Sequence, residues 1–298
     1  MNAATDFSNA LAQAVEMASS ATVLVDARRR YPASGIAFEA DLVLTADHVV
    51  TRDERILVRT ESNEQLEASI AGRDPGSDLA VLRLREKGLA KALPTSALPK
   101  VGQLVLALGR PNDAGVQASW GIVTAIGGPA RTGRGGLLDQ YIQSETTPYP
   151  GFSGGPLIDT DGNVLGLNTS GLTRGSSLTI PTAVAIRIGQ ALAKDGTVKR
   201  GYLGIRTQEV ELDQSAAGAA ALSQNTGLLV VWLEQDGPAA RAGLLVGDIL
   251  VGIAGHTVKD ADDIFVALSA DTVGKPVDVR ILRGGKSQVL RVTVGTRQ

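Results

Sequence analysis

The hexamer Gly151-Phe152-Ser153-Gly154-Gly155-Pro156 contains the residue of this chain best suited to covalent chemistry, a serine flanked by glycines. Glycine adopts backbone angles that cost other residues energy, so such a segment can present a serine hydroxyl on a tight turn. A serine hydroxyl becomes a nucleophile only when a base removes its proton and a third group orients that base. Such a hexamer alone is often just a turn, so its meaning depends on the bases available elsewhere.

The chain has two histidines, His48 and His256, so few residues can act as a base. His48 follows the apolar run 42–46, and Asp78 directly precedes the strand-like run 79–82. Each residue has a simple structural explanation, because polar residues commonly begin and end strands. Together they supply a nucleophile, Ser153, a base, His48, and an orienting acid, Asp78, in the chain order of chymotrypsin-like triads. His256 is interpreted as an exposed turn residue without a catalytic role.

Acyl transfer also needs hydrogen-bond donors for the developing oxyanion. The backbone N–H groups of Gly151 and Ser153, together with that of Phe152, are the predicted donors. The glycines of the hexamer fit this role, because a chain that turns successive N–H groups toward a substrate often needs angles that only glycine adopts cheaply.

The composition narrows the remaining functions. With 29 basic and 31 acidic residues the net charge is −2, which gives no electrostatic reason to expect a nucleic-acid partner. The absence of cysteine excludes disulfides and thiolate chemistry, and no cofactor or metal is predicted. The N-terminal 20 residues have neither a basic start nor a continuous apolar stretch, so they predict no signal peptide and no membrane span. A cytoplasmic protein is therefore expected, with export to the periplasm after removal of a leader as the alternative.

Short β-rich runs separated by glycine, proline and asparagine turns fill the first two thirds of the chain. Such a pattern is typical of an antiparallel barrel or sandwich. The predicted strands are 22–25, 35–38, 42–45, 55–59, 67–72, 79–84, 104–109, 117–125, 140–143 and 164–168.

Helical spacing of apolar residues predicts one helix near the N-terminus and another over 181–194. We divide the chain into an N-terminal helical segment (1–20), a first domain (21–196), a linker (197–200) and a second domain (201–298). The second domain is predicted to contain β-strands and two short helices, over 238–242 and 261–270.

Several blocks in this order resemble the HtrA/Deg family of trypsin-fold serine proteases that carry PDZ domains. The blocks are Leu44-Thr45-Ala46-Asp47-His48-Val49-Val50, Asp78-Leu79-Ala80-Val81-Leu82, Tyr141-Ile142-Gln143-Ser144-Glu145, Pro150-Gly151-Phe152-Ser153-Gly154-Gly155-Pro156-Leu157, Gly166-Leu167-Asn168-Thr169, Gly201-Tyr202-Leu203-Gly204-Ile205 and 236–250. The resemblance implies a mainly β protein: a double β-barrel protease domain of two six-stranded barrels, with the active site between them, followed by one C-terminal PDZ domain.

The chain departs from this family at the nucleophile loop, where Phe152 and Tyr149 stand at positions that are usually asparagine. The bulk of Phe152 near the cleft is expected to affect substrate access or to favour a resting loop. Thr147, six residues before Ser153, stands at the expected floor of the primary specificity pocket, with Leu178 and Ile180 as its walls. Because Thr147 is uncharged, the resemblance implies cleavage after small or medium aliphatic residues rather than after arginine or lysine.

The second domain is expected to bind the C-terminal end of a peptide as an added strand, with backbone N–H groups holding the terminal carboxylate. The segment Tyr202-Leu203-Gly204-Ile205 is the predicted carboxylate loop. Ile264, Phe265 and Leu268 are predicted to line the opposite side of the groove, with a role in the domain core as the alternative. Occupancy of this groove is expected to recruit substrates or to shift the protease toward an ordered state.

The resulting prediction is an ATP-independent serine endopeptidase that degrades unfolded or damaged proteins. A catalytically silent, peptide-binding, chaperone-like protein is the alternative, and an esterase is a third use of the same triad. The expected partners are polypeptide substrates, C-terminal peptides and further copies of the chain. A trimer is favoured by the resemblance, although Phe7 is the only aromatic residue before Tyr31.

Overall fold

The computed structural model describes residues 2–95, 97–133, 136–172, 177–212, 224–268 and 272–297. Contacts divide the chain into two compact units, Met1–Val198 and Lys199–Gln298. The point of division lies within the predicted linker 197–200.

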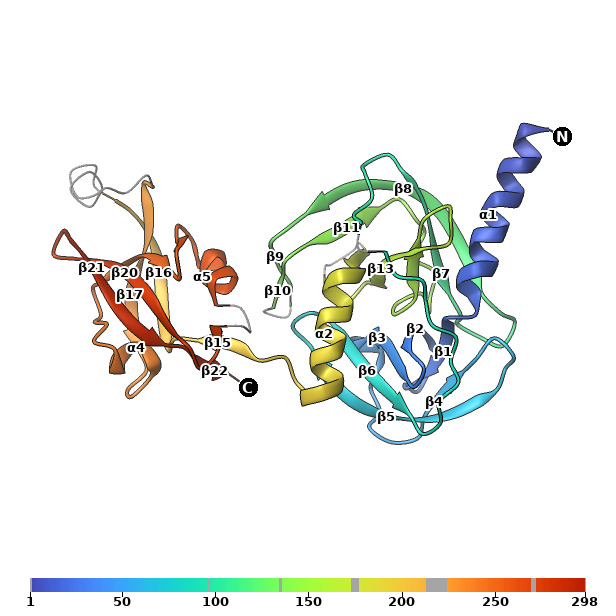
Figure 1. Ribbon diagram of the computed structural model, residues 1–298, viewed down its shortest axis with the longest axis horizontal. Helices are drawn as coiled ribbons and strands as arrows, with labels where there is room; N and C mark the ends of the chain where they lie inside the picture. The colour runs from blue at the N-terminus through green and yellow to red at the C-terminus, as the bar shows by residue number, and fades with distance from the viewer. Residues whose placement is uncertain are drawn as a thin grey trace. The chain divides into compact units, whose positions relative to one another are not determined.

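Six antiparallel strands form the first closed barrel of unit one, in the order β1-β2-β3-β6-β5-β4 (Figure 1). Every residue of β3 is buried, because Val43 packs in the barrel interior and Leu44 packs in a second core outside it. The strands are β1 (Thr22–Asp26), β2 (Ala33–Glu39), β3 (Leu42–Ala46), β4 (Ile56–Arg59), β5 (Gln65–Asp74) and β6 (Leu79–Leu84).

The second barrel closes in the order β11-β14-β13-β12-β7-β8. Successive residues of β7 point to opposite faces, so Val105 and Ala107 join one apolar cluster and Leu106 and Leu108 join another. The strands are β7 (Leu104–Gly109), β8 (Gln117–Gly127), β11 (Tyr141–Ser144), β12 (Pro156–Ile158), β13 (Val164–Thr169) and β14 (Leu178–Pro181), with a separate ribbon of β9 (Ala130–Arg131) and β10 (Leu137–Leu138). The short strands β12 and β14 are absent from the sequence prediction.

Two helices accompany the barrels. Helix α1 (Ala3–Ser19) begins at Asn2, whose side chain accepts a hydrogen bond from the Ala4 N–H. Helix α2 (Thr182–Asp195) contacts β5 and β6 of the first barrel and β13 of the second, as Figure 1 shows. It ends at Gly196, whose φ of 76° closes the last turn with a hydrogen bond to the Leu192 carbonyl. Helix α2 therefore covers the junction between the barrels.

Unit two is built around a sheet in the order β16-β17-β18-β20-β21, with β19 paired to β18, and a separate ribbon of β15 and β22. Strand β16 lies at the sheet edge. Helix α5 (Ala261–Ala267) begins with a capping box formed by Asp260 and Asp263. The remaining elements are β15 (Arg200–Tyr202), β16 (Ile205–Glu211), β17 (Thr226–Leu233), α4 (Pro238–Arg241), β18 (Ile249–Ile253), β19 (His256–Thr257), β20 (Pro276–Arg283), β21 (Lys286–Thr293) and β22 (Gly295–Arg297).

Candidate active site

Strand register brings His48 and Asp78 together. Strands β3 and β6 pair with Ala46 opposite Leu79, and His48 follows the first strand while Asp78 precedes the second. His48 Nδ1 lies 2.8 Å from Asp78 Oδ2, and the His48 backbone N–H donates to Asp78 Oδ1 over 2.9 Å. Because Nδ1 is held by the carboxylate, Nε2 is the ring nitrogen left to exchange a proton.

Asp78 is held in an unusual environment for a carboxylate. Its φ is 56°, and its side chain has no exposed surface. Burial alone would raise the pKa of Asp78, but hydrogen bonds from His48 and the Thr169 hydroxyl, with the charge of His48, hold that pKa below its ordinary value. The carboxylate therefore stays ionised beside the imidazole.

The backbone at Gly171 packs directly against the pair. A Cβ atom at Gly171 would lie 2.4 Å from Asp78 Oδ2 and 2.6 Å from His48 Nδ1. On the other side, the Asp47 N–H donates to the Asp78 carbonyl, and the Asp47 carboxylate accepts from Arg73 Nε at 2.6 Å. The turn that carries His48 is therefore fixed from both directions.

Ser153 lies between β11 and β12, in a loop attached to the first barrel. The Ser34 N–H donates to the Ser153 carbonyl at 3.2 Å, and Ser34 Oγ donates to the Gly151 carbonyl at 2.7 Å. Gly154 has a φ of +89°, and a Cβ there would lie 2.0 Å from the Ser34 carbonyl oxygen. Glycine is therefore required at this position for both conformation and space.

The Phe152 side chain is buried and anchors the loop, while Phe152 is also one of the residues that line the cavity. Its side chain is 2% exposed and packs in the apolar cluster of Val105 and Leu157. Its ring also meets Tyr149 edge to face, with centroids 5.4 Å apart. Because the ring is almost fully buried in the second barrel, it presents little surface to the cavity that Phe152 helps to line.

The backbone N–H of Phe152 donates to the Tyr149 carbonyl at 3.0 Å. The N–H groups of Gly151 and Ser153 have no hydrogen-bond partner in the described part of the chain. Of the three predicted oxyanion donors, these two remain available, and Phe152 is occupied by the turn itself.

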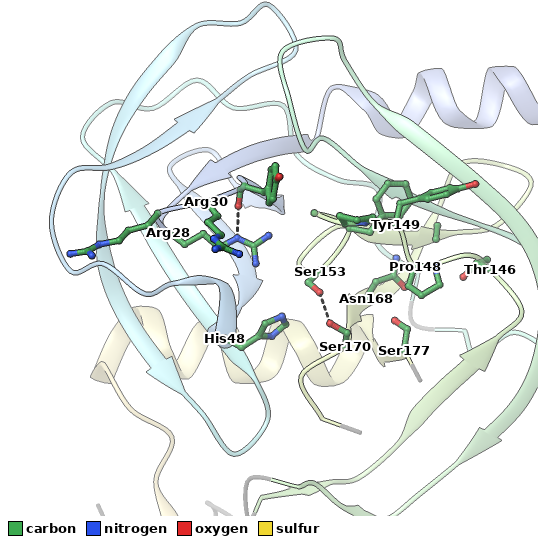
Figure 2. Close-up of a pocket in the computed structure, with 16 residues that line it drawn as sticks. Arg28, Arg30, His48, Thr146, Pro148, Tyr149, Ser153, Asn168, Ser170 and Ser177 are labelled. Atoms are coloured by element: carbon green, nitrogen blue, oxygen red, sulfur yellow. Dashed lines mark hydrogen bonds between the residues drawn. The ribbon is translucent and has the colours of Figure 1, made fainter. Parts of the chain in front are cut away.

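His48 and Ser153 line one cavity of about 710 Å³. Figure 2 shows Ser153 between His48 on one side and Thr146, Pro148 and Tyr149 on the other. Ser153 Oγ lies 3.1 Å from Ser170 Oγ, which is its hydrogen-bond partner among the described residues. A hydrogen bond from Ser153 to His48 would require the Ser153 hydroxyl to turn from Ser170 toward the imidazole. Catalytic hydrogen bonds often form only when substrate is bound.

The predicted specificity residues lie elsewhere. Leu178 and Ile180 are in strand β14, 6% and 0% exposed, where they pack in the core shared with Leu167. Thr147 is exposed, and its carbonyl accepts a hydrogen bond from the Ser119 hydroxyl at 3.0 Å. None of the three lines the cavity. The residues that line the cavity instead include Ala107, Thr146, Pro148, Asn168, Ser170 and Ser177.

In unit two the segment 202–205 connects β15 to the edge strand β16. Gly204 has a φ of 75°, and the N–H groups of Leu203 and Gly204 have no partner among the described residues. The side chain of Leu203 is buried in the core of the unit, and Ile205 is half-buried at the start of β16. This loop has the free N–H groups and the sheet edge that a carboxylate site requires.

The three predicted groove residues of the second helix differ in burial. Leu268 is 6% exposed and belongs to the core, Ile264 is partly buried against it, and Phe265 is 41% exposed. The burial of Leu268 therefore favours the alternative role in the domain core over a role in lining the groove. His256 is exposed on strand β19, outside the cavity.

Sequence reasoning missed the support given by Thr169 and Gly171 and the arginines of the β1–β2 loop. Thr169 belongs to the block 166–169, but its hydroxyl is linked to Asp78 only by long-range folding. Arg28, Arg29 and Arg30 likewise come to line the cavity with Ser153 only through long-range folding.

Two antiparallel barrels with a His–Asp pair and a serine at their junction define the class of trypsin-like peptidases. Residues 33–167 match the family model "Trypsin-like peptidase domain", and residues 201–294 match the model "PDZ domain". The mainly β fold predicted from the sequence, a double barrel followed by a PDZ domain, is confirmed.

Curated relatives carry the same combination. A probable periplasmic serine endoprotease DegP-like protein of Pseudomonas putida is 38% identical over 269 residues, covering 88% of this chain and 55% of the relative. A protein of the same description from Halomonas elongata is 35% identical over 278 residues, covering 90% and 57%. The chain spans about half the length of these relatives.

Solved structures match over nearly their full length. The HtrA-type protease AlgW with a decapeptide has a TM-score of 0.80 at 28% identity, with 97% of this chain and 99% of that chain covered. A variant of AlgW with a tripeptide has a TM-score of 0.81 at 30% identity, covering 97% of each chain. The serine endoprotease from Yersinia pestis has a TM-score of 0.78 at 29% identity, covering 97% and 98%. The chain belongs to the HtrA-type family of trypsin-like serine proteases with a PDZ domain.

None of the helices in the described ranges is long and apolar enough to cross a membrane.

Proposed function

We propose that this chain is a serine endoprotease with Ser153 as nucleophile, His48 as general base and Asp78 as the orienting acid. The observation that carries the proposal is the buried Asp78 carboxylate bonded to His48 Nδ1, in a ring whose other side lines the cavity of Ser153. Ser153 Oγ attacks the substrate carbonyl and gives its proton to His48 Nε2. The N–H groups of Gly151 and Ser153 stabilise the oxyanion, and His48 returns the proton to the leaving amine.

Labelling with a fluorophosphonate tests this proposal. The wild type is expected to be labelled at Ser153, whereas Ser153→Ala and His48→Ala are expected to lose labelling. Ser177→Ala is the matched control, because Ser177 lines the same cavity without a part in the proposed chemistry. A folded wild type that is never labelled would refute the enzyme and support the chaperone-like alternative. Ester and protein substrates, compared on the labelled enzyme, separate an esterase from a protease.

For substrate choice we propose cleavage after small or medium aliphatic residues. The cavity wall beside Ser153 is formed by small or uncharged side chains such as Ala107, Thr146 and Asn168, and no described lining residue is acidic. A buried lysine or arginine side chain would find no carboxylate there. Digestion of an unfolded protein and mass spectrometry of the new chain ends tests this preference; ends that follow arginine or lysine would contradict it.

We propose that the protease degrades unfolded or damaged proteins, and that the PDZ domain recruits these substrates or activates the protease. The free N–H groups of Leu203 and Gly204 beside edge strand β16 support capture of a peptide carboxylate. Turnover of an unfolded substrate, measured with a hydrophobic peptide bearing a free or an amidated C-terminus, tests both parts. We expect the free-acid peptide to change the turnover and the amidated peptide to leave it unchanged. Equal turnover under both conditions, with binding of the free acid confirmed, would refute the coupling.

The predicted domain division, oligomer and location belong to the same proposal. A homo-oligomer is proposed, with a trimer favoured, and the 45% exposure of Phe7 on α1 agrees with it. Light scattering after size-exclusion chromatography measures the mass of the oligomer. For location, the names of the relatives favour the periplasmic alternative over the cytoplasmic prediction. Fractionation of cells expressing the complete gene product distinguishes the two.

A further inference from the structure

The cavity around Ser153 has two chemically different walls. Arg28, Arg29 and Arg30, from the loop between β1 and β2 of the first barrel, form one wall. Thr146, Pro148, Tyr149 and Pro150, from the loop after β11 of the second barrel, form the other wall and carry no charge. Figure 2 shows Arg28 and Arg30 on one side of Ser153, and Pro148 and Tyr149 on the other. A substrate that crosses Ser153 therefore passes from an uncharged wall to a cationic one.

The arginine loop is held in place by its first member. Arg28 is partly buried, and its guanidinium donates to the carbonyls of Tyr31 and Pro32. Pro32 in turn adjoins β2, whose Ser34 is bonded to the nucleophile loop. The cationic wall is thus connected to the same hydrogen-bond network that positions Ser153.

Arg29 and Arg30 are exposed and form no ion pair with any residue that the structure describes. Other arginines of this barrel behave differently: Arg52 pairs with Asp26 at 2.6 Å and Arg59 pairs with Asp113 at 2.6 Å. The two unpaired guanidinium groups are therefore available to a ligand with negative charge.

The reaction geometry decides which part of the substrate meets them. His48 returns its proton to the leaving amine, so the residues after the scissile bond leave on the side of His48. Figure 2 shows His48 on the same side of Ser153 as Arg28 and Arg30. A neighbouring cavity of about 500 Å³ shares Tyr31 and Pro150 with the first, so it lies next to this loop.

We infer that Arg29 and Arg30 form a recognition site for aspartate and glutamate side chains in the part of a polypeptide substrate that follows the scissile bond. The inference rests on the proposed protease function and adds a specificity element to it. The two carboxylates that line the neighbouring cavity, Asp26 and Asp113, are paired with arginines and do not cancel the cationic wall.

The test uses three peptides that share one sequence before the scissile bond, taken from a cleavage site mapped in an unfolded protein. The second and third residues after the bond are both Asp, both Ala or both Lys. Two exposed charge pairs predict about a tenfold ratio of kcat/KM between the acidic and the basic peptide at low salt. The ratio is expected to shrink toward one in about 0.5 M salt, because the contacts are exposed.

All three peptides form the same acyl-enzyme, so only the acylation rate is expected to differ and the deacylation rate is expected to stay constant. The double variant Arg29→Glu/Arg30→Glu is expected to reverse the order of the acidic and basic peptides and to leave the Ala peptide within about threefold. The control Lys87→Glu/Lys100→Glu makes the same change in net charge on exposed residues that line neither cavity, and is expected to keep the wild-type order.

Equal acylation of the three peptides by the wild type would overturn the inference. So would a variant that slows all three equally, since that result assigns the arginines to loop structure alone. Failure of the protease function has a different signature: no peptide is cleaved and Ser153 is not labelled by a fluorophosphonate. The salt dependence of the wild type supplies a measurement that does not depend on the folding of any variant.

Discussion

At the residue scale, the proposal that His48 is the base is supported by what surrounds Asp78 rather than by His48 itself. Three donors converge on the carboxylate: the His48 ring, the His48 N–H and the Thr169 hydroxyl. Because the folded pKa of Asp78 lies below its ordinary value of 3.8, its contribution to stability is present above that pH and is lost as pH falls through the folded pKa. The His–Asp contact is therefore intact at neutral pH.

Thr169→Val removes one of these donors while keeping the shape of the side chain. Loss of a hydrogen bond to a charged group costs about 1.5–3 kcal/mol, so we expect kcat/KM to fall by roughly 10- to 100-fold. The pKa of Asp78 should rise, so activity on the acid side should be lost at a higher pH than in the wild type. Thr182→Val is the control, because the Thr182 hydroxyl bonds the Val164 carbonyl away from the site. Identical pH profiles of kcat/KM for Thr169→Val and wild type would contradict this role.

At the element scale, the loop between β11 and β12 is positioned by a ring that fits against a strand end. Gly109 is the last residue of β7, and a Cβ there would lie 2.5 Å from Phe152 Cδ1. The resemblance draws attention to Phe152 as a departure from the family, but not to the glycine that accommodates it. The fit of the Phe152 ring against Gly109 is therefore one of the contacts that couple the loop to the second barrel.

Gly109→Ala is expected to displace the Phe152 ring and, with it, the N–H groups of Gly151 and Ser153. Overpacking of this kind costs about 1–3 kcal/mol of folding stability. We expect a lower melting temperature and slower fluorophosphonate labelling. Adding Phe152→Leu to Gly109→Ala should recover part of the labelling rate, because the smaller side chain makes room for the new methyl group. Wild-type labelling by Gly109→Ala alone would show that the contact does not position the loop.

At the scale of the whole molecule, the two units are stabilised by separate cores and separate buried carboxylates. In unit two, Asp248 accepts two hydrogen bonds from Arg283, at 2.7 Å each, and one from the Leu245 N–H. Burial raises the pKa of Asp248, but these donors outweigh it and hold the pKa below its ordinary value of 3.8. Asp248 thus stabilises unit two above that pH, and the contribution is lost as pH falls through the folded pKa.

Asp248→Asn should lower the melting temperature of unit two at neutral pH. The difference in melting temperature between the variant and the wild type should shrink as pH falls below about 4. The two tryptophans, Trp120 and Trp232, lie in different units, so fluorescence in a Trp120→Phe background follows unit two. Asp278→Asn, an exposed carboxylate on β20, serves as control and should change little. A difference that persists unchanged to low pH would mean that the Asp248 charge is not the stabilising feature.

Local sequence patterns predict some elements of this fold and not others. Helix α2 is predicted because Val184, Ile188 and Leu192 recur at helical spacing before the stop at Gly196. Strands β12 and β14 are not predicted, because every residue of both is buried and neither shows the alternation of a half-buried strand. The resemblance places Leu178 and Ile180 at the pocket wall, whereas in the structure both faces of strand β14 are buried.

By itself the sequence determined the residue types of the triad, their order, the mainly β architecture and the family, because each is carried by short contiguous blocks. Tertiary structure alone decided where Phe152 points, which N–H groups stay free, and which residues form the two walls of the cavity. Those properties depend on contacts between residues that are far apart in the chain, such as Ser34 with Gly151 and Thr169 with Asp78. A hydrogen bond or a packing contact across two barrels exists only after both barrels have closed, so no local pattern records it.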